Sequence, residues 1–154
     1  MPQRLGQHFL RDGGVLNAIT KALRLESRDR VLEIGPGHGV LTRELARQAG
    51  TVFAIELDGS LVERLRETFG TAKNVTIIHA DALETDPCTL WDERPDGESS
   101  LPIGVTGGDN PPYKLAGNIP YYISGALLRR YLGTPCPPSL SVLMVQLEVA
   151  RRIV

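Results

Sequence analysis

Short apolar runs alternate along the chain with longer stretches in which apolar residues recur at every third or fourth position. The short runs predict buried strands, and the longer stretches predict amphipathic helices. The predicted strands are residues 31–34, 52–55, 74–78, 113–117 and 141–146, and the predicted helices are residues 13–25, 40–49, 60–69 and 124–131, with a further helix from about Glu148. Because strands and helices alternate, we expect an α/β fold with a doubly wound, mostly parallel sheet.

The alternation stops in residues 84–112, which are rich in Pro, Gly, Asp and Ser. This stretch is long for a connection in a compact domain, and its end, Gly107-Gly-Asp-Asn-Pro-Pro112, is typical of turns. We therefore expect an irregular insertion at about residues 85–112 within one domain of residues 1–154. The chain stops at Val154, shortly after the last predicted helix begins, so we also expect a fragment whose sheet is truncated after the fifth strand.

The composition is that of an ordinary globular domain, with 154 residues, 42% of them hydrophobic and 23% charged. No apolar run is long enough for a transmembrane helix, and the N-terminus lacks the apolar segment of a secretory signal. Cys88 and Cys136 lack CxxC spacing, so we expect free thiols in a reducing cytoplasm, with neither a disulfide nor zinc. The three histidines are scattered, which argues against a metal site, and we expect a cytoplasmic monomer.

The net charge of −1 hides an uneven distribution. Residues 1–30 carry six basic and three acidic side chains, and residues 129–154 carry four arginines and one glutamate. Residues 81–110 carry eight acidic side chains and a single arginine. The two basic ends are compatible with a phosphate-binding surface, but ordinary solvated surface charge explains them at least as well.

A glycine-rich turn, Gly35-Pro-Gly-His-Gly39, joins the first predicted strand to the next helix. Glycines permit a tight turn and let the backbone approach a ligand closely. Glu56 ends the second strand, where a carboxylate accepts hydrogen bonds from ribose hydroxyls, and Asp81 ends the third, where it would accept from an adenine amino group or shape the adjoining loop. All three features lie at carboxyl ends of strands, so ligand binding is favoured over an ordinary tight turn.

The spacing of the glycines bears on which ligand binds. Dinucleotide-binding turns follow Gly-x-Gly-x-x-Gly, whereas here Val40 stands at the position of the third glycine and Glu33 precedes the turn. A nucleoside with a charged amino-acid tail, S-adenosylmethionine, fits this pattern better than NAD. A nicotinamide-dependent oxidoreductase remains the alternative enzyme class.

The tetrapeptide Asn118-Ile-Pro-Tyr121 closes the fourth predicted strand. The Asn118 side-chain oxygen can accept from an exocyclic amine, and Pro120 has no N–H to compete with the neighbouring carbonyl acceptors. Two acceptors aimed at one amino group would direct its lone pair out of the ring plane, and Tyr121 offers a face on which a base can stack. The alternative is a turn in which Asn118 caps the next helix and Tyr121 packs, which becomes the minority interpretation beside a cofactor site.

Six segments in order resemble the successive motifs of the ribosomal RNA adenine dimethyltransferases: Gly6–Leu10, Val31–Gly37, Ala54–Asp58, His79–Ala82, Gly117–Tyr121 with Ile123-Ser124, and Met144–Ala150. The resemblance implies a Rossmann-like methyltransferase fold and transfer of methyl groups from S-adenosylmethionine to adenosine N6. The small-subunit branch of this family dimethylates two adjacent adenosines near the 3′ end of small-subunit ribosomal RNA. Ribosomal RNA, or a precursor of the small ribosomal subunit, is the implied partner.

By position, the resemblance also implies roles for individual residues. The implied cofactor contacts are His8, Leu10, Gly35, Gly37, Glu56, Asp81 and Asn118, and the implied catalytic pocket for the target adenine is Asn118, Pro120 and Tyr121. His8 stands where asparagine is common in the family, a departure that keeps a polar side chain.

Two other functions remain open within this resemblance. Macrolide-resistance enzymes share the Gln-x-Phe-Leu and Asn-x-Pro-Tyr motifs but modify large-subunit RNA, although residues 146–152 resemble the small-subunit branch more closely. The second alternative function is that of a non-catalytic RNA-binding or ribosome-assembly module on the same fold. Family members continue through further strands and a helical C-terminal domain, so we expect this chain to hold much of the cofactor pocket yet to be inactive on RNA alone.

Overall fold

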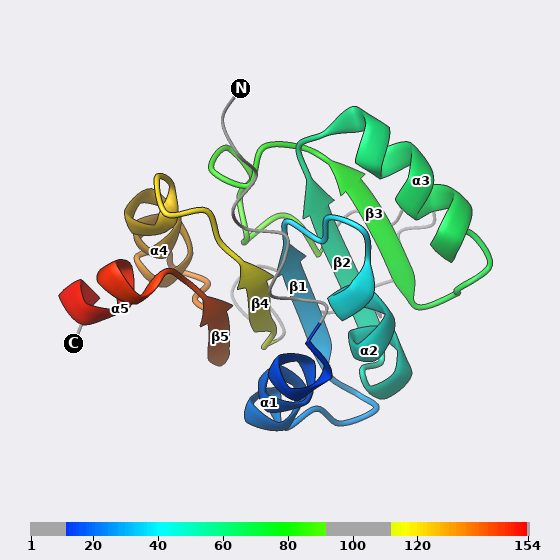
Figure 1. Ribbon diagram of the computed structural model, residues 1–154. Helices are drawn as coiled ribbons and strands as arrows, with labels where there is room; N and C mark the ends of the chain where they lie inside the picture. Colours follow the sequence, from blue (N-terminus) through cyan, green and yellow to red (C-terminus); the bar gives the residue numbers. More distant parts are fainter. Residues whose placement is uncertain (1–11, 92–111, 154) are drawn as a thin grey trace.

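The computed structural model describes residues 12–91 and 112–153 as a parallel sheet with helices on both faces (Figure 1). The strands are β1 (Arg30–Ile34), β2 (Thr51–Glu56), β3 (Val75–His79), β4 (Lys114–Asn118) and β5 (Leu140–Met144). The helices are α1 (Gly13–Leu23), α2 (Val40–Gln48), α3 (Gly59–Phe69), α4 (Ser124–Leu132) and α5 (Leu147–Ile153). Every predicted strand and helix is confirmed, with ends that differ by at most two residues.

All four strand pairs are parallel, and the order across the sheet is β3-β2-β1-β4-β5. The chain therefore builds outward from β1 through β2 and β3, and then returns to the other side of β1 to add β4 and β5. The strand arrows in Figure 1 all point to one edge of the sheet, the carboxyl edge. The reversal between β1 and β4 creates the crevice at which open α/β sheets bind ligands.

The side chains of the central strands alternate between two cores. Val31 and Val52 point to the face covered by α1 and α2, whose Leu23, Leu41 and Leu45 are fully buried. Leu32, Ile34 and Leu115 point to the other face, where Leu127 and Tyr131 of α4 cover them. Strands that are buried on both faces read as continuous apolar runs, which is why the sequence predicted them well.

The second face is covered partly by an irregular segment, residues 80–91, where a helix would otherwise come after β3. The Trp91 ring stacks on Phe53 with centroids 4.6 Å apart and lies 5.5 Å from the Tyr113 ring. The Tyr131 hydroxyl donates to the carbonyl of Ala82 at 2.9 Å, which ties α4 to this segment. Of the predicted insertion, residues 85–91 form no helix or strand, and residues 92–111 lie outside the described part of the chain.

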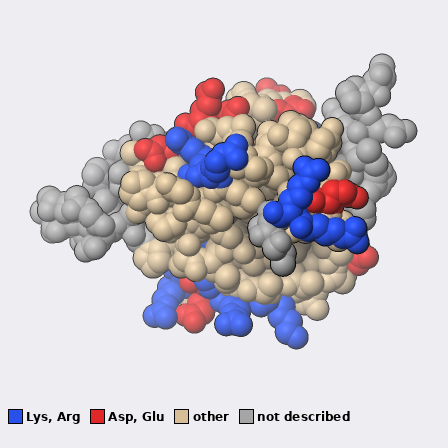
Figure 2. Space-filling model, turned by 90° about the vertical axis from the view of Figure 1, so that its left-hand side faces the viewer, with Lys and Arg blue, Asp and Glu red and all other residues tan. Residues whose placement is uncertain are grey.

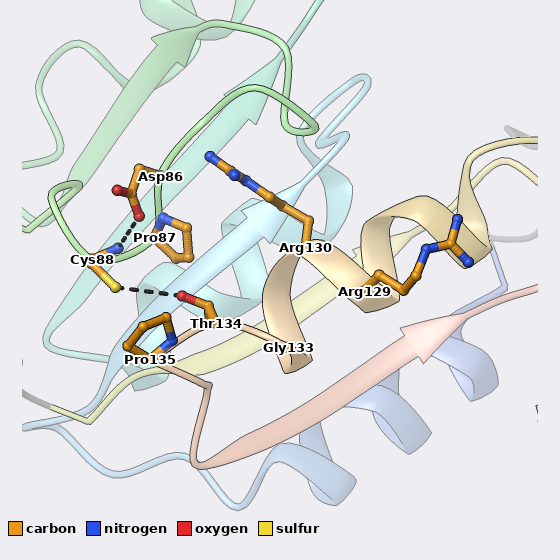
Figure 3. A pocket seen from close by; sticks show the side chains of 8 residues that line it. All are labelled: Asp86, Pro87, Cys88, Arg129, Arg130, Gly133, Thr134 and Pro135. Carbon is orange, nitrogen blue, oxygen red and sulfur yellow. Dashed lines mark hydrogen bonds between the residues drawn. The ribbon is translucent and has the colours of Figure 1, made fainter.

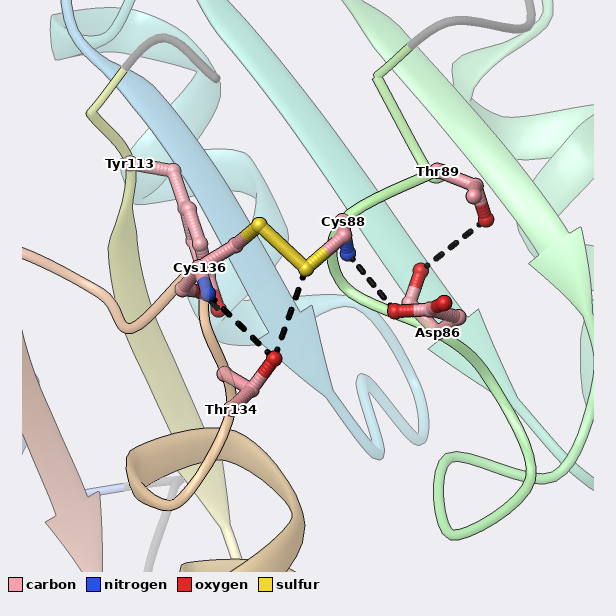
Figure 4. Close-up of a disulfide and its surroundings, with 6 residues drawn as sticks. All are labelled: Asp86, Cys88, Thr89, Tyr113, Thr134 and Cys136. Carbon is pink, nitrogen blue, oxygen red and sulfur yellow. Dashed lines mark hydrogen bonds between the residues drawn. A yellow bond between two sulfur atoms is a disulfide. The ribbon is translucent and has the colours of Figure 1, made fainter. Parts of the chain in front are cut away.

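The expectation of two free thiols is wrong, because Cys88 and Cys136 form a disulfide (Figure 4). Their Cα atoms are 5.4 Å apart, within the range that a disulfide requires. The irregular segment carries Cys88 back across the sheet to the amino end of β4, where the Tyr113 hydroxyl donates to the carbonyl of Cys136 at 3.2 Å. A sequence separation of 48 residues gave no sign of this proximity.

The described residues contain neither a membrane-spanning helix nor a metal-binding cluster. None of the helices in residues 12–91 and 112–153 is long and apolar enough to cross a membrane. The same residues contain no group of three or more His, Cys, Asp or Glu side chains placed to hold a metal ion.

Candidate functional site

The glycine turn after β1 adopts a backbone that only glycine takes up readily. Gly35, Gly37 and Gly39 have φ angles of 67°, 58° and 76°, all in the left-handed region. The N–H of Gly35 donates to the carbonyl of Ile55 at 3.0 Å, and that of Gly39 donates to Pro36 at 2.9 Å. The turn is therefore held against the end of β2 and leads directly into α2.

The three glycines differ in what surrounds them. A Cβ atom on Gly39 would lie 2.6 Å from the Phe69 ring and 2.9 Å from Leu65, so Gly39 lets α3 pack against the turn. A Cβ atom on Gly37 would meet no atom within 4 Å, so the surface there is open. Gly37 rather than Gly39 thus offers backbone to a ligand.

Glu56 connects the glycine turn to the start of α3. One carboxylate oxygen accepts from the N–H of Gly37 at 3.1 Å, and the other accepts from Leu57 at 2.9 Å and Asp58 at 3.0 Å. The Glu56 side chain is buried, with 8% of the residue exposed. A carboxylate has about four acceptor positions, so acceptor capacity for a hydroxyl group remains after these three bonds.

Glu33 is a buried acid beneath the glycine turn. It is 1% exposed, and its Oε2 atom has no hydrogen-bond partner among the described residues. Burial raises the pKa of Glu33 to about 7, and the negative charge of Glu56 adds to the rise. The nearby Thr42 hydroxyl offsets part of this increase in pKa, although it forms no hydrogen bond of good geometry.

Asp81 lies next to Glu56 at the carboxyl edge, because the N–H of Ala80 donates to the carbonyl of Glu56 at 3.2 Å. One Asp81 carboxylate oxygen accepts from the N–H of Leu83 at 2.8 Å, so this side chain shapes its own loop. Leu57, which follows Glu56 in the chain, is 66% exposed. Leu57 is not among the predicted site residues, since an apolar residue next to a strand gives no sign of its exposure.

Asn118 is brought to the glycine turn by a close approach of β1 and β4. A Cβ atom on Gly117 would lie 2.6 Å from the carbonyl oxygen of Ile34, so only glycine allows this backbone spacing. The Cβ position of Gly35 is 3.7 Å from the Asn118 carbonyl oxygen. The two motifs that the sequence separates by about eighty residues are therefore in contact.

The rest of the tetrapeptide forms a fixed turn. Ile119 is 3% exposed and donates its N–H to the carbonyl of Met144 at 2.9 Å. The Pro120 carbonyl accepts from the Ile123 N–H at 3.2 Å and from the buried Ser124 hydroxyl at 2.9 Å. The carbonyl of Ile119 accepts none of the hydrogen bonds found in this described turn.

The alternative in which Asn118 caps a helix and Tyr121 packs is wrong. The N-cap of α4 is Ile123, which makes no side-chain cap bond. Tyr121 is 61% exposed and Tyr122 is 74% exposed, so neither ring belongs to the core. His8 and Leu10, the remaining predicted contacts, lie outside the described residues.

A separate hollow of about 350 Å³ lies away from this edge, between residues 86–88 and the end of α4 (Figure 3). Arg130 extends from α4 toward residues 84–88, where its guanidinium donates to the carbonyls of Thr85 at 2.9 Å and Glu84 at 3.2 Å. The disulfide cysteine Cys88 lines the same hollow. These contacts hold α4 to the irregular segment and explain the hollow without a ligand.

A model of the family described as ribosomal RNA adenine dimethylase matches residues 2–154. The ribosomal RNA small subunit methyltransferase A of Dehalococcoides mccartyi is 47% identical over 150 residues, which cover 97% of this chain and 46% of that protein. The protein of the same name from Pelotomaculum thermopropionicum is 44% identical, over 97% of this chain and 48% of that protein. The chain thus spans about half the length of the curated relatives that it matches.

Solved structures give the same family. The crystal structure of the 23S rRNA methyltransferase ErmE superposes with a TM-score of 0.72 at 32% identity, covering 94% of this chain and 50% of that one. A dimethyladenosine transferase from Plasmodium falciparum superposes with a TM-score of 0.71 at 27% identity. The superposition covers 92% of this chain and 44% of that one. The fold is therefore that of a Rossmann-like methyltransferase.

Proposed function

Since the chain belongs to the ribosomal RNA adenine dimethylase family, we propose that residues 1–154 form the cofactor-binding domain of an rRNA adenine N6-dimethyltransferase. Its substrate is proposed to be a pair of adjacent adenosines near the 3′ end of small-subunit ribosomal RNA, and its location the cytoplasm. The observation that carries the proposal is the contact between the glycine turn and Asn118 at the carboxyl edge. The small-subunit branch is favoured because the Dehalococcoides mccartyi protein named for it is 47% identical to this chain, whereas the 23S enzyme is 32% identical.

Several features of the described site fit S-adenosylmethionine. The unpartnered Oε2 of Glu33 lies beneath the turn and suits a ligand with positive charge, while Gly37 leaves open space for its tail. Glu56 has acceptor capacity for the ribose hydroxyls, and the exposed Leu57 and the Asp81 carboxylate suit the adenine. His8 and Leu10 are further proposed contacts, from the family resemblance.

The proposed chemistry needs only positioning of the target amine. The adenine N6 lone pair forms the new N–C bond as the S–C bond of the sulfonium breaks toward sulfur, and the amine then releases a proton to solvent. The Asn118 side-chain oxygen and the Ile119 carbonyl, left without a competing N–H by Pro120, would accept from the amino group. Tyr121 would stack on the ring, and such positioning supplies most of the rate.

Arginines near the tetrapeptide support RNA as the partner. Arg129 on α4 and Arg151 and Arg152 on α5 are exposed and form no ion pair within the described residues. Figure 2 looks onto the α4 and α5 side and shows several groups of Lys and Arg side chains, some with acidic side chains beside them. Phosphate contacts from such side chains supply most of the affinity for nucleic acid.

Calorimetry and a methyl-transfer assay test this function. The 154-residue chain should bind S-adenosylmethionine and should not bind NAD. With methyl transfer followed by mass spectrometry of rRNA nucleosides, Asn118→Ala should lower the rate by at least about 100-fold, in a longer chain if this one is inactive alone. Asn17→Ala, an exposed change on α1, is the matched control.

The outcomes distinguish the alternatives. NAD binding would indicate an oxidoreductase, and unchanged methyl transfer by Asn118→Ala would exclude the role of Asn118. Methylation of large-subunit RNA in place of small-subunit RNA would assign the chain to the macrolide-resistance branch. RNA binding without any methyl transfer, in the longer chain too, would indicate an assembly module.

A further inference from the structure

Exposed apolar side chains are concentrated at the carboxyl edge of the sheet. The large hydrophobic residues that are exposed in the described part of the chain are Leu57, Tyr121, Tyr122, Leu132 and Leu147. Leu57 comes directly after β2, the two tyrosines come after β4, and Leu147 begins α5 shortly after β5. Only Leu132, at the end of α4, lies elsewhere among these described residues. Exposed apolar side chains that gather at one edge of a fold indicate a binding surface.

Tyr122 is the most exposed of these residues, at 74%, and the proposed methyl transfer gives it no role. Its ring centroid lies 5.6 Å from that of Tyr121, and the two ring planes meet at 88°. Because the rings are perpendicular, one flat base cannot stack on both. A ligand that uses both faces must present two separate rings.

The turn fixes the backbone of Tyr122 on both sides. Ile123 packs against the core beneath α4. Its N–H and the Ser124 hydroxyl both donate hydrogen bonds to the Pro120 carbonyl. Ile119, on the other side, is buried and bonded to β5. The ring is therefore presented to solvent on a rigid support, which lowers the entropy that is lost when a partner stacks on it.

The charge of the neighbouring helices favours RNA as the occupant. α4, which begins just after the tyrosines, carries Arg129, and α5, which begins with Leu147, carries Arg151 and Arg152. Proteins that bind single-stranded nucleic acid combine aromatic stacking platforms with basic side chains in this way. A protein partner with an apolar surface would gain nothing from these three positive charges.

We propose that Tyr122 is a second base-stacking platform, which holds the unpaired RNA nucleotide next to the one placed at Tyr121. This inference rests on the proposed function and adds to it. It makes the substrate a splayed, single-stranded dinucleotide whose bases occupy two perpendicular surfaces. Stacking tolerates any base, so Tyr122 positions the flanking nucleotide without reading its identity.

A short single-stranded RNA with two adjacent adenosines tests the proposal, with affinity measured by fluorescence anisotropy. Tyr122→Ala should weaken binding about 5- to 150-fold, the range expected for one base–aromatic stack. Tyr122→Phe, which keeps the ring, should stay within about twofold of the wild type. Leu132→Ala, which removes an exposed apolar side chain away from the edge, is the control and should bind as the wild type does.

A second readout separates the two tyrosines. With 2-aminopurine at the flanking position, binding should quench its fluorescence in the wild type and in Tyr121→Ala but not in Tyr122→Ala. With 2-aminopurine at the target position, the pattern of the two variants should be reversed. Circular dichroism and thermal midpoints would show that each variant is folded.

Three outcomes would overturn the inference. These are wild-type affinity and quenching in Tyr122→Ala, an equal loss of affinity in Tyr122→Phe, and no RNA binding by the wild-type chain. The proposed function is tested separately by S-adenosylmethionine binding and by Asn118→Ala, so it can survive the failure of the Tyr122 assignment.

Discussion

At the scale of single residues, the sequence indicates which side chains lie at the carboxyl edge but not how exposed each one is. Glu56 and Asn118 could be predicted because each ends a strand, and parallel strands end together. Leu57 and Tyr122 could not, since an apolar residue beside a strand is usually buried. The burial of Glu33 could not be predicted either, because it depends on how α2 packs over β1.

Glu33 makes the stability of the fold depend on pH. Its pKa is raised to about 7 in the folded chain from an ordinary value of 4.5, so between these values the folded state holds more protons than the unfolded state. Stability must therefore fall as pH rises through this window. The loss should be about 2–3 kcal/mol between pH 5 and pH 8 in the free energy of unfolding.

Urea denaturation at pH 5 and pH 8 measures this effect. Glu33→Gln keeps the size of the side chain and removes its charge, so the variant should be more stable than the wild type at pH 8 and similar to it at pH 5. Identical pH profiles for the two proteins would show that Glu33 does not titrate in this range.

At the scale of elements, the sequence predicted each strand and helix because apolar periodicity reflects local geometry and burial. It could not show how the chain continues after β3, where the fold uses Trp91 and the irregular segment in place of a helix. Composition marks that segment as irregular, but it does not say which face of the sheet the segment covers. The disulfide depends on the same packing and was missed for the same reason.

The disulfide between Cys88 and Cys136 should contribute to stability by closing a loop with a sequence separation of 48 residues. In the loop-entropy model such a closure removes freedom from the unfolded chain and is worth about 4 kcal/mol. A reducing agent should lower the free energy of unfolding by about 2–4 kcal/mol in urea titrations. The double variant Cys88→Ser with Cys136→Ser should be as unstable without reductant as the reduced wild type. Adding reductant should not change its free energy of unfolding. An unchanged stability after complete reduction would contradict this role.

At the scale of the whole molecule, the two basic ends of the sequence differ in whether their basic side chains form ion pairs. The group of arginines in residues 129–154 lies on α4 and α5, next to the exposed tyrosines, and Arg129, Arg151 and Arg152 have no acidic partner among the described residues. In the N-terminal basic end, residues 1–30, Arg28 by contrast pairs with Glu26. The net charge of −1 does not show this difference in ion pairing between the two ends.

If the arginines on α4 and α5 contact RNA phosphates, their removal must change how binding depends on salt. For a single strand, each neutralised phosphate adds about 0.7 to the slope of log affinity against log salt. Replacing Arg129, Arg151 and Arg152 by Gln should therefore reduce that slope by about 2. The charge-matched control replaces Arg43 on α2, Arg64 on α3 and Lys73 in the turn before β3, which are all exposed, and should leave the slope nearly unchanged. An equal reduction in both triple variants would mean that RNA responds only to total charge, and the face at α4 and α5 would then have no special part in binding.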